Sequence, residues 1–389
     1  MTNFTQNEPH MNESIDNFTQ TEYLVTFLTF IYSFIATQFF NGWGKWIQNI
    51  DNDRPSLNHI LFSILCFVLL IDFWWISFPR SAGMAASLPA FFASLFSPII
   101  FSVLAFNIFP RGRTEDANLT AYFYRRGRFM FAILALDFLA NVVLDHILIG
   151  SAWWGAETVF RLAGVTFCLA GMLFPNRQVI RLLNLVGFFV LTLHIVLFGD
   201  PPVSVEGYGL TEHLTIFLTL VYGVIASRFI SGWSHILQHI RTIQFSREHL
   251  AWSFFAFALL IDFWWGSWLR ESYIRQHLGY FLLSLALPIL FYAQVVVLFP
   301  FREYLDKIQL HDYFELHHRW IIALFGCILL VNAITANVME DHWLSPENVY
   351  RLIGILLVIM VLSFRSTSLR RFSLVAASLL LIVHTILEV

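Results

Sequence analysis

The apolar residues of this chain come in about twelve runs, each long enough to cross a lipid bilayer as a helix. About 20 helical residues, at roughly 1.5 Å per residue, cross a hydrocarbon core roughly 30 Å thick. Inside that core every backbone N–H and C=O group needs a partner within the chain, and a helix supplies one locally. The sequence therefore predicts an all-α polytopic membrane protein with about twelve transmembrane helices.

Composition argues against a soluble domain of any size. Apolar residues make up 58% of the 389 residues and charged residues 13%, against roughly 45–50% and about 25% in an ordinary soluble domain. The connections between the runs are too short to hold a catalytic domain outside the membrane. The segment 1–20 is polar and acidic, without a basic or an apolar signal region, so no cleaved signal peptide is expected.

The predicted spans follow the apolar runs closely. They are 23–43, 58–78, 84–109, 129–147, 158–174, 180–198, 213–233, 250–269, 278–299, 320–338, 349–364 and 371–388.

The two halves of the chain match each other when one is shifted by 190 positions. The segments 69–75 and 259–265 both read LLIDFWW, and Gly42-Trp43 meets Gly232-Trp233. The register slips by one residue at the fourth span of each half and then recovers. A match of this length indicates an internal duplication. The predicted organisation is a polar tail at 1–20, a six-helix repeat at 21–198, a short link at 199–210 and a second repeat at 211–389.

The basic residues indicate which side of the membrane each connection faces. Most lie after odd-numbered spans, including Lys45, Arg126, Arg302 and Arg371. By the positive-inside rule these connections are predicted to be cytoplasmic, which puts both termini on the extracytoplasmic side of the cell membrane, the cytoplasmic membrane if the chain is bacterial. Six spans per copy give both copies the same orientation, so a pseudo-twofold axis along the membrane normal is expected.

This predicted plan resembles that of the major-facilitator carriers, which also consist of two parallel six-helix halves. In that plan a solute path runs between the halves. The chain departs from it in the outward position of its termini, in the short link at 199–210 and in the loop after the second helix, which lacks the glycine-and-arginine pattern of those carriers. The resemblance is one of architecture and implies no membership of the family.

Positions that are identical in both copies indicate which helix faces contact protein. In the first span they form one arc of the helical wheel, which includes Leu28 and Tyr32. Val25 lies outside this arc and is predicted to face lipid. Every residue of 69–75 recurs in the second copy, so this segment and its counterpart 259–265 are predicted to be enclosed by protein on all sides.

Ionisable residues within spans are candidate functional residues, because burying a charge in a membrane is costly. Asp72 and Asp262 lie about 9 Å inside the outer ends of their helices. Arg161 and Arg351, in spans five and eleven, are their predicted partners. Such a pair either lines a solute path as a gated ion pair or proton site, or bridges two helices without moving.

Glu157 and Glu347 offer a second set of partners. Each precedes an arginine by four residues at a helix start, the spacing of an i,i+4 ion pair, and so competes with the aspartate for the same arginine. Asn141 and Asn332 occupy matching places in spans four and ten, where an amide most often bridges neighbouring helices.

Two acids and two histidines are secondary candidates. Asp137 and Asp145 occur only in the first copy, so a cation or proton path would favour the amino-terminal half. His59 and His249 lie at the cytoplasmic ends of their spans, where a haem bound across the pseudo-twofold axis is an alternative. Neither a metal site nor a cofactor is expected, because no His or Cys spacing indicates one.

Three classes of function are compatible with these features. A transporter or channel for a small solute or ion is favoured, with its path between the copies or within each one. The alternative is a non-transporting module that binds a partner or lipid or senses the membrane, and the third class is an intramembrane redox protein or enzyme. Transport predicts a polar cavity at the aspartates, whereas a module predicts a dry, closed bundle. The expected surroundings are the lipid bilayer, no nucleic acid is expected as a partner, and the sequence sets no oligomeric state.

Overall fold

The computed structural model describes residues 20–48, 55–109, 119–174, 176–200, 210–238, 247–299, 309–340, 346–364 and 366–388. The predicted tail up to residue 19 and most of the predicted link, 201–209, lie outside these ranges. Within them every regular element is a helix.

All twelve predicted spans fall on helices. The first half contains α1 (Gln20–Gln48), α2 (Leu57–Trp75), α3 (Ser81–Ala85), α4 (Leu88–Ser94), α5 (Phe96–Ile108), α6 (Leu119–Ile149), α7 (Ala156–Leu173) and α8 (Arg177–Phe198). The second half contains α9 (Leu210–Gln238), α10 (Arg247–Leu269), α11 (Glu271–Ile274), α12 (Leu278–Leu298), α14 (Leu310–Glu340), α15 (Pro346–Ser363) and α16 (Thr367–Glu388).

Ten helical segments of the described chain are long and apolar enough to cross a membrane. One of them, Leu88–Ile108, combines α4 and α5. The chain is therefore an integral membrane protein of the all-α class. In α15 the apolar segment Asn348–Ser363 is shorter, so the crossing of α15 and α16, and with it the total of twelve spans, stays a prediction.

Polar side chains cap several of these helices at their first turn. The hydroxyl of Ser56 accepts a hydrogen bond from the backbone N–H of His59 at the start of α2, 3.2 Å away. Asn176 caps α8 in the same way, and the His277 ring accepts from Gly279 at the start of α12. These caps satisfy backbone donors that a helix leaves unpaired at its first turn.

The predicted span 84–109 is divided into α3, α4 and α5. The chain bends at Leu95, and α5 begins at Phe96. Pro98 therefore lies in the first turn of α5, where its missing N–H costs no helical hydrogen bond. The equivalent Pro288 lies inside the continuous helix α12, so the two halves treat the same residue differently.

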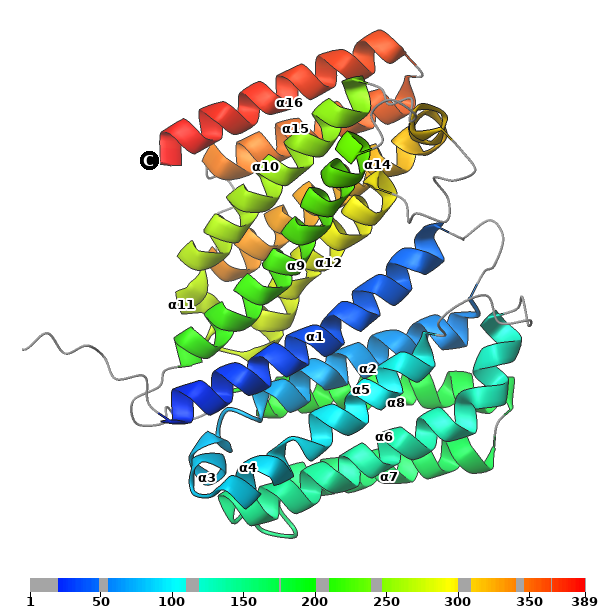
Figure 1. Ribbon diagram of the computed structural model, residues 1–389, viewed down its shortest axis with the longest axis vertical. Coiled ribbons are helices and arrows are strands. Elements are labelled where there is room, and N and C mark those ends of the chain that lie inside the picture. The colour runs from blue at the N-terminus through cyan, green and yellow to red at the C-terminus, as the bar shows by residue number, and fades with distance from the viewer. Residues whose placement is uncertain are drawn as a thin grey trace, which may run out of the picture.

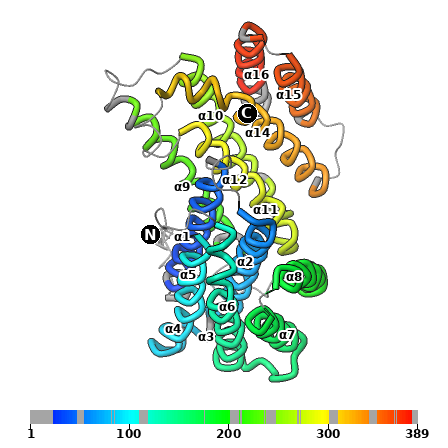
Figure 2. Tube along the Cα trace, turned by 90° about the vertical axis from the view of Figure 1, so that its right-hand side faces the viewer, coloured from blue at the N-terminus to red at the C-terminus, as the bar shows by residue number. Residues whose placement is uncertain are grey.

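The two halves lie on opposite sides of α1 (Figure 1). In that view α2 and α4 to α8 lie below α1, and α9, α10, α12 and α14 to α16 lie above it. The helix α1 packs on α9 and α12 of the second half as well as on α2, α3 and α5 of its own. Figure 2 shows α15 and α16 at the top of the molecule and α7 and α8 on the right below its middle.

The contact between the halves is one-sided. The helix α12 packs on α1 and α2, whereas the packing partners of the equivalent α5 are α1, α2, α4 and α6 of its own half. A pseudo-twofold axis would give the two copies matching contacts across the interface. The symmetric arrangement of the repeats is therefore not confirmed by the described helices.

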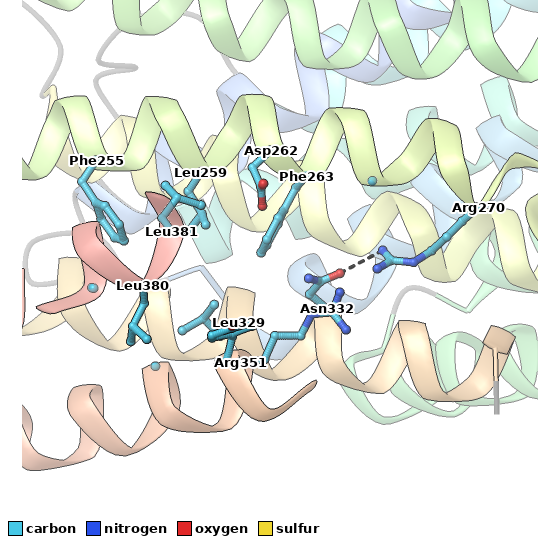
Figure 3. Close-up of a pocket in the computed structure, with 14 residues that line it drawn as sticks. Phe255, Leu259, Asp262, Phe263, Arg270, Leu329, Asn332, Arg351, Leu380 and Leu381 are labelled. Carbon is cyan, nitrogen blue, oxygen red and sulfur yellow. Dashed lines mark hydrogen bonds between the residues drawn. The ribbon is translucent and has the colours of Figure 1, made fainter. Parts of the chain in front are cut away.

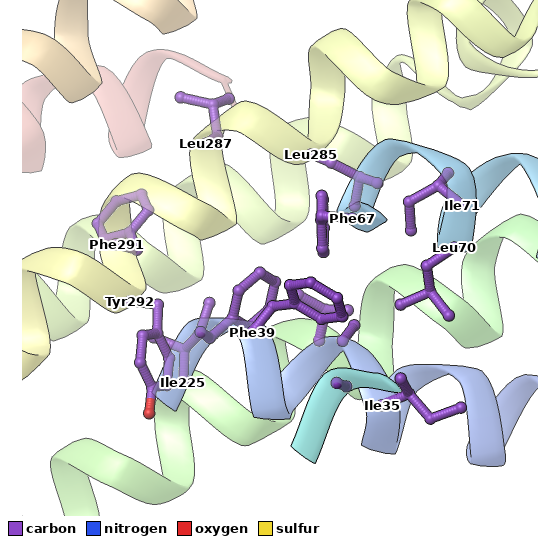
Figure 4. Packing of buried hydrophobic residues seen from close by; sticks show 14 of the residues in the cluster. Ile35, Phe39, Phe67, Leu70, Ile71, Ile225, Leu285, Leu287, Phe291 and Tyr292 are labelled. Atoms are coloured by element: carbon purple, nitrogen blue, oxygen red, sulfur yellow. The ribbon is translucent and has the colours of Figure 1, made fainter. Parts of the chain in front are cut away.

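Buried apolar side chains fill the seam between the halves (Figure 4). Phe39 and Phe67 of the first half and Ile225, Phe291 and Tyr292 of the second belong to one buried cluster, and each is at most 4% exposed. A seam packed in this way excludes water. Apolar packing thus lines the interface between the halves, one of the two routes considered for a solute.

Two polar contacts and a ring stack also join the halves. The Tyr292 hydroxyl donates to the Asn41 side chain, and the His213 ring lies 3.2 Å from the hydroxyl of Thr29. The same ring stacks on Trp74 at a centroid distance of 4.2 Å. In a bilayer, where lipid is as apolar as the helices, such close packing and hydrogen bonds hold helices together.

The predicted faces of α1 are confirmed on one side and wrong on the other. Leu28 and Tyr32 are buried, at 1% and 2% exposure, and Phe30 is 55% exposed. Val25, predicted to face lipid, is only 1% exposed. The reason is the central position of α1, since α9 and α12 cover a second face that one six-helix unit would leave bare.

The segment 69–75 of α2 is enclosed by protein as predicted, whereas the matching segment 259–265 of α10 is not. Every residue of 69–75 in α2 is at most 3% exposed. In the matching segment of α10, Ile261 is 44% and Trp265 is 55% exposed. The prediction was wrong for α10 because α2 is covered by α12 from the other half, and α10 has no such cover among the described helices.

Two matching glycines let each first helix approach a phenylalanine ring. A Cβ at Gly42 would collide with the ring of Phe109, and one at Gly232 with the ring of Phe299. Each ring is buried, so it has little space to move away. These glycines allow close helix contact, the usual role of small residues in membrane bundles.

We expect Gly42→Ala to lower the thermal stability of the purified protein, because the added methyl group displaces the Phe109 ring. Gly223→Ala is the matched control, since a Cβ at this exposed position of α9 meets no atom within 4 Å, and alanine raises helix propensity. Fluorescence-detected size-exclusion chromatography after heating measures both. Equal melting temperatures for the two variants would contradict the proposed role of Gly42.

Candidate functional site

One buried carboxylate holds two buried arginines in the first half. The Nε of Arg80 donates to Oδ1 of Asp145 over 2.6 Å, and Arg161 from α7 forms an ion pair with the other carboxylate oxygen. All three side chains are at most 3% exposed. Burial lowers the pKa of the Arg80 guanidinium to about 10, which leaves it charged at neutral pH. We call Arg80, Asp145 and Arg161 the arginine clamp.

Asn141 and Ser97 extend the clamp toward the middle of the first half. Arg80 donates to the Asn141 side-chain oxygen over 2.8 Å, and the Asn141 amide donates to the Ser97 hydroxyl over 2.9 Å. Asn141 therefore joins α5 and α6 to the segment that follows α2, as predicted for an interhelical amide. Asp137 lies one turn away on α6 and is fully buried, and neither carboxylate oxygen makes a hydrogen bond of ordinary geometry.

The predicted Asp72–Arg161 ion pair does not form. Asp72 lies nearest to His194, with 3.5 Å between its Oδ1 and the ring Nε2, while Arg161 pairs with Asp145 and Glu157. The helix-start pair with Glu157 is confirmed, at 3.2 Å. Asp145 takes the place expected of Asp72 because its carboxylate approaches both arginines at once, and two guanidinium groups compensate a buried charge better than one.

In the second half the matching arginines are held by amides. Arg270 donates to the Asn332 side-chain oxygen over 3.0 Å, as Arg80 does to Asn141. Arg351 donates to Asn348 over 2.7 Å, and Asn348 donates to Asn337 over 3.0 Å. The position of Asp145 is occupied by Ala336. The side chain of the candidate Glu347 lies outside the described residues.

A cavity opens in the second half beside Asp262 (Figure 3). Its volume is about 80 Å³. The lining residues come from α10, the turn that follows it, α14, α15 and α16: Phe255, Leu259, Asp262, Phe263, Gly266, Arg270, Leu329, Asn332, Tyr350, Arg351, Gly354, Ala377, Leu380 and Leu381. In Figure 3 Asn332 lies between Arg351 and Arg270, with Asp262 facing them from α10. The candidate residues Asp262, Arg351 and Asn332 thus line one cavity together with Arg270, and the Asp262–Arg351 ion pair stays a prediction.

Smaller side chains account for a cavity at this place. Gly266 stands where the first copy has Ile76, and Leu329 stands where it has Phe138. Phe138 is 3% exposed and lies against Gly164 of α7. A Cβ at Gly266 would meet only the Arg270 guanidinium, at 4.0 Å. Two side chains at this place in the first half are therefore replaced by smaller ones in the second.

The two secondary histidines have a structural role. The ring Nε2 of His59 lies 2.9 Å from the carbonyl oxygen of Ile108, and that of His249 lies 2.9 Å from the carbonyl oxygen of Leu298. The His59 ring thus joins α2 to the end of α5, and the His249 ring joins α10 to the end of α12. With Nε2 engaged in this way, the haem alternative that joins His59 to His249 is not supported.

At the end of the bundle opposite the arginine clamp, ion pairs lie in the second half. In the second half Arg370 of α16 pairs with Glu248 of α10 and, at 2.8 Å, with Glu315 of α14. In the first half the corresponding place is neutral, where Asn58 donates to the Tyr124 hydroxyl over 2.7 Å. The ion pairs of Asp145 in the first half and of Arg370 in the second therefore lie at opposite ends of the bundle.

The sequence analysis missed Arg80 and Arg270 as site residues. Both were assigned to connections outside the spans, yet their side chains are only 3% and 8% exposed. The signal was present, since the two arginines are separated by the same 190 positions as Asp72 and Asp262. A positive charge retained in both copies on the side of the membrane that is poor in basic residues is a candidate for burial.

Comparison with protein-family models, with curated proteins and with solved structures gives no match for this chain. In the part of the chain that the structure describes, no three His, Cys, Asp or Glu side chains are grouped as metal ligands. The site is therefore characterised by its geometry: a charged, packed clamp in one half and a cavity lined by arginines in the other.

We expect Asp145→Ala to destabilise the protein by about 3–5 kcal/mol, because it leaves two buried arginines without their shared carboxylate. Asp137→Asn is the matched control in the same helix and is expected to be neutral or stabilising, because it removes the charge of a buried carboxylate whose oxygens make no hydrogen bond of ordinary geometry. Unfolding in a sodium dodecyl sulfate titration measures both. Equal losses in the two variants would show that the clamp has no special role.

Proposed function

We propose that this protein is a membrane carrier or channel for a small solute, and that the solute binds within the second half. The observation that supports the proposal is the cavity beside Asp262, which joins two buried arginines and an amide to an apolar wall. A concave, mostly apolar site with a few convergent polar groups is the usual form of a small-molecule site. Intramembrane charges at such a site are candidates for solute or ion binding.

In this proposal the first half is the fixed partner of the second. Its clamp is packed and charged, and Asp72 is only 3% exposed. A buried ion network of this kind resists rearrangement, because opening it would expose unpaired charges to an apolar environment. The expected cation or proton path through Asp137 and Asp145 gains no support from this closed packing.

A second candidate function is binding without transport, in which the protein holds a ligand as a membrane module. The dry seam between the halves favours it, since a closed bundle is what a module predicts. Flux separates the two functions, because only the carrier or channel moves the solute across a sealed membrane.

We expect Gly266→Ile to abolish solute flux, because it restores the side chain that fills the same place in the first half. The assay uses proteoliposomes with labelled sodium, chloride, glycerol, glycine and acetate as probes. At least one probe is expected to move faster than in protein-free liposomes, and the variant is expected to lower that flux to the protein-free rate. If no probe moves, transport of this class of solute is excluded and the binding module remains.

Gly223→Ile is the matched control for this experiment. It makes the same chemical change at an exposed position of α9, where an added Cβ meets no atom within 4 Å. Its flux is expected to equal that of the unmodified protein. Leu329→Phe is a second filling variant that checks for misfolding of the first. A flux that persists in both filling variants would contradict a path through the cavity.

We also propose that both termini lie on the extracytoplasmic side and that each half crosses the membrane six times. We expect a cysteine at Ser151, between α6 and α7, to react with an impermeant maleimide added outside intact cells. A cysteine at Ser366, between α15 and α16, is expected to react only after the cells are opened. Labelling of both from the same side would contradict either the crossing of α15 or the assigned topology.

A further inference from the structure

We infer that the first half binds the headgroup of an anionic phospholipid with arginines at the start of α6 and α8. The binding surface consists of Arg128 on α6 and of Arg177 and Arg181 on α8, all three exposed, and we call it the arginine patch. It lies apart from the cavity of the second half and goes beyond the proposed function. The two halves differ at this end of the bundle in whether acids stand beside their arginines.

The arginine patch is assembled around Tyr124 of α6. Asn58, at the start of α2, donates to the Tyr124 hydroxyl over 2.7 Å and to the carbonyl oxygen of Arg177 over 3.0 Å. The Arg177 guanidinium lies over the Tyr124 ring, 5.3 Å from its centroid. Arg128 follows Tyr124 by four residues and Arg181 follows Arg177 by four. Because residues four apart share a helix face, the three arginines gather beside Tyr124.

At the matching place the second half pairs its arginines with acids. Arg370 of α16 forms ion pairs with Glu248 of α10 and Glu315 of α14. The carboxylate of Glu248 also lies 3.6 Å from Arg371, the counterpart of Arg181. The positive charge at this end of the second half is therefore balanced within the protein.

In the first half both acidic positions are neutral. Asn58 and Tyr124 stand where the second half has its two glutamates. The described segments that begin or end at this place are 55–63, 119–131, 168–174 and 177–185, and none of them contains Asp or Glu. These segments therefore offer the arginine patch no carboxylate, and an external anion is the natural counterion.

The arginine patch lies where the lipid-facing surface begins. Arg128 stands just before the apolar run of α6, and Arg181 stands at the start of the apolar run of α8. Beside them Leu182 and Leu185 of α8 are 62% and 54% exposed, so this side of α8 faces acyl chains. An arginine at the end of a membrane helix extends its guanidinium to the level of the headgroups.

Arginine is well suited to a phosphate group, because the planar guanidinium donates two parallel hydrogen bonds to two oxygens. Each basic residue near an anionic membrane surface strengthens lipid binding about fivefold. Three arginines together give a preference of about a hundredfold for an anionic headgroup over a zwitterionic one. The zwitterionic headgroup also has a phosphate, but its ammonium group is repelled by the arginines.

The decisive variant replaces the three arginines of the patch by glutamine. The purified full chain in detergent is titrated with phosphatidylglycerol and with phosphatidylcholine of the same acyl chains, and native mass spectrometry measures the bound lipid. We expect the unmodified protein to prefer phosphatidylglycerol. Arg128→Gln combined with Arg177→Gln and Arg181→Gln is expected to weaken phosphatidylglycerol binding about a hundredfold and to leave phosphatidylcholine binding unchanged.

The matched control removes the same charge from the same end of the second half. It combines Arg247→Gln, Arg319→Gln and Arg371→Gln, which replace three exposed arginines. Phosphatidylglycerol binding is expected to be retained. Equal losses in the two triple variants would show that net charge alone attracts the lipid, and would overturn the arginine patch.

Arg181→Gln alone keeps the test valid if the triple variant does not fold, with an expected loss of about fivefold. Glycerol 3-phosphate, added at the same concentration as the lipid, separates a lipid headgroup from a free phosphate compound. It is expected to leave phosphatidylglycerol bound. Displacement by glycerol 3-phosphate, or equal binding of the two lipids to the unmodified protein, would overturn the inference. Solute flux enters none of these measurements, so failure of the proposed function and failure of the lipid site are distinguishable.

Discussion

Two arginines buried near one end of the first half depend on a single carboxylate. A guanidinium cannot shed its charge, so each one that leaves water needs compensation within the protein. Asp145 supplies it to Arg80 and Arg161 together, and through them it connects α6, α7 and the turn after α2. These contacts hold the turn that follows α2 against α6 and α7.

In the second half amides accept hydrogen bonds from the matching arginines. Arg270 donates to Asn332, and Arg351 donates to Asn348, which donates in turn to Asn337. Amides satisfy hydrogen bonds but bring no charge, so the two halves differ in their electrostatics although their arginines match. The second half instead places its ion pairs at the opposite end, where Arg370 joins two glutamates on α10 and α14.

The helices could be predicted from the sequence because the thickness of a bilayer sets the length of the apolar run that crosses it. All twelve predicted segments are helical, and the identical positions of α1 identified the buried Leu28 and Tyr32. The buried face at Val25 was not predictable, because a helical wheel compares a helix with itself and carries no record of a neighbour from the other half. The same limit explains why α2 and α10, with identical central segments, differ in exposure.

The sequence indicated several residues of the candidate site but not all of the ion pairs between them. Arg161, Arg351, Asn141 and Asn332 all lie in the buried polar regions, and Asp262 lines the cavity. The pairing of Arg161 with Asp145 was missed because depth along a helix was compared and direction around it was not. Asp145 was a candidate for a cation or proton path, whereas in the structure its carboxylate pairs with two arginines.

That difference has a physical consequence for the space around the arginines. Arginines recur at matching positions of both halves, but their surroundings are packed to different degrees. Filling a cavity and pairing its charges stabilises a protein, and binding requires that some of this stabilisation be left to the ligand. The first half has Ile76, Phe138 and Asp145 at this place and is packed. The second has Gly266, Leu329 and Ala336, three smaller side chains at one place, and Gly266 and Leu329 line the cavity.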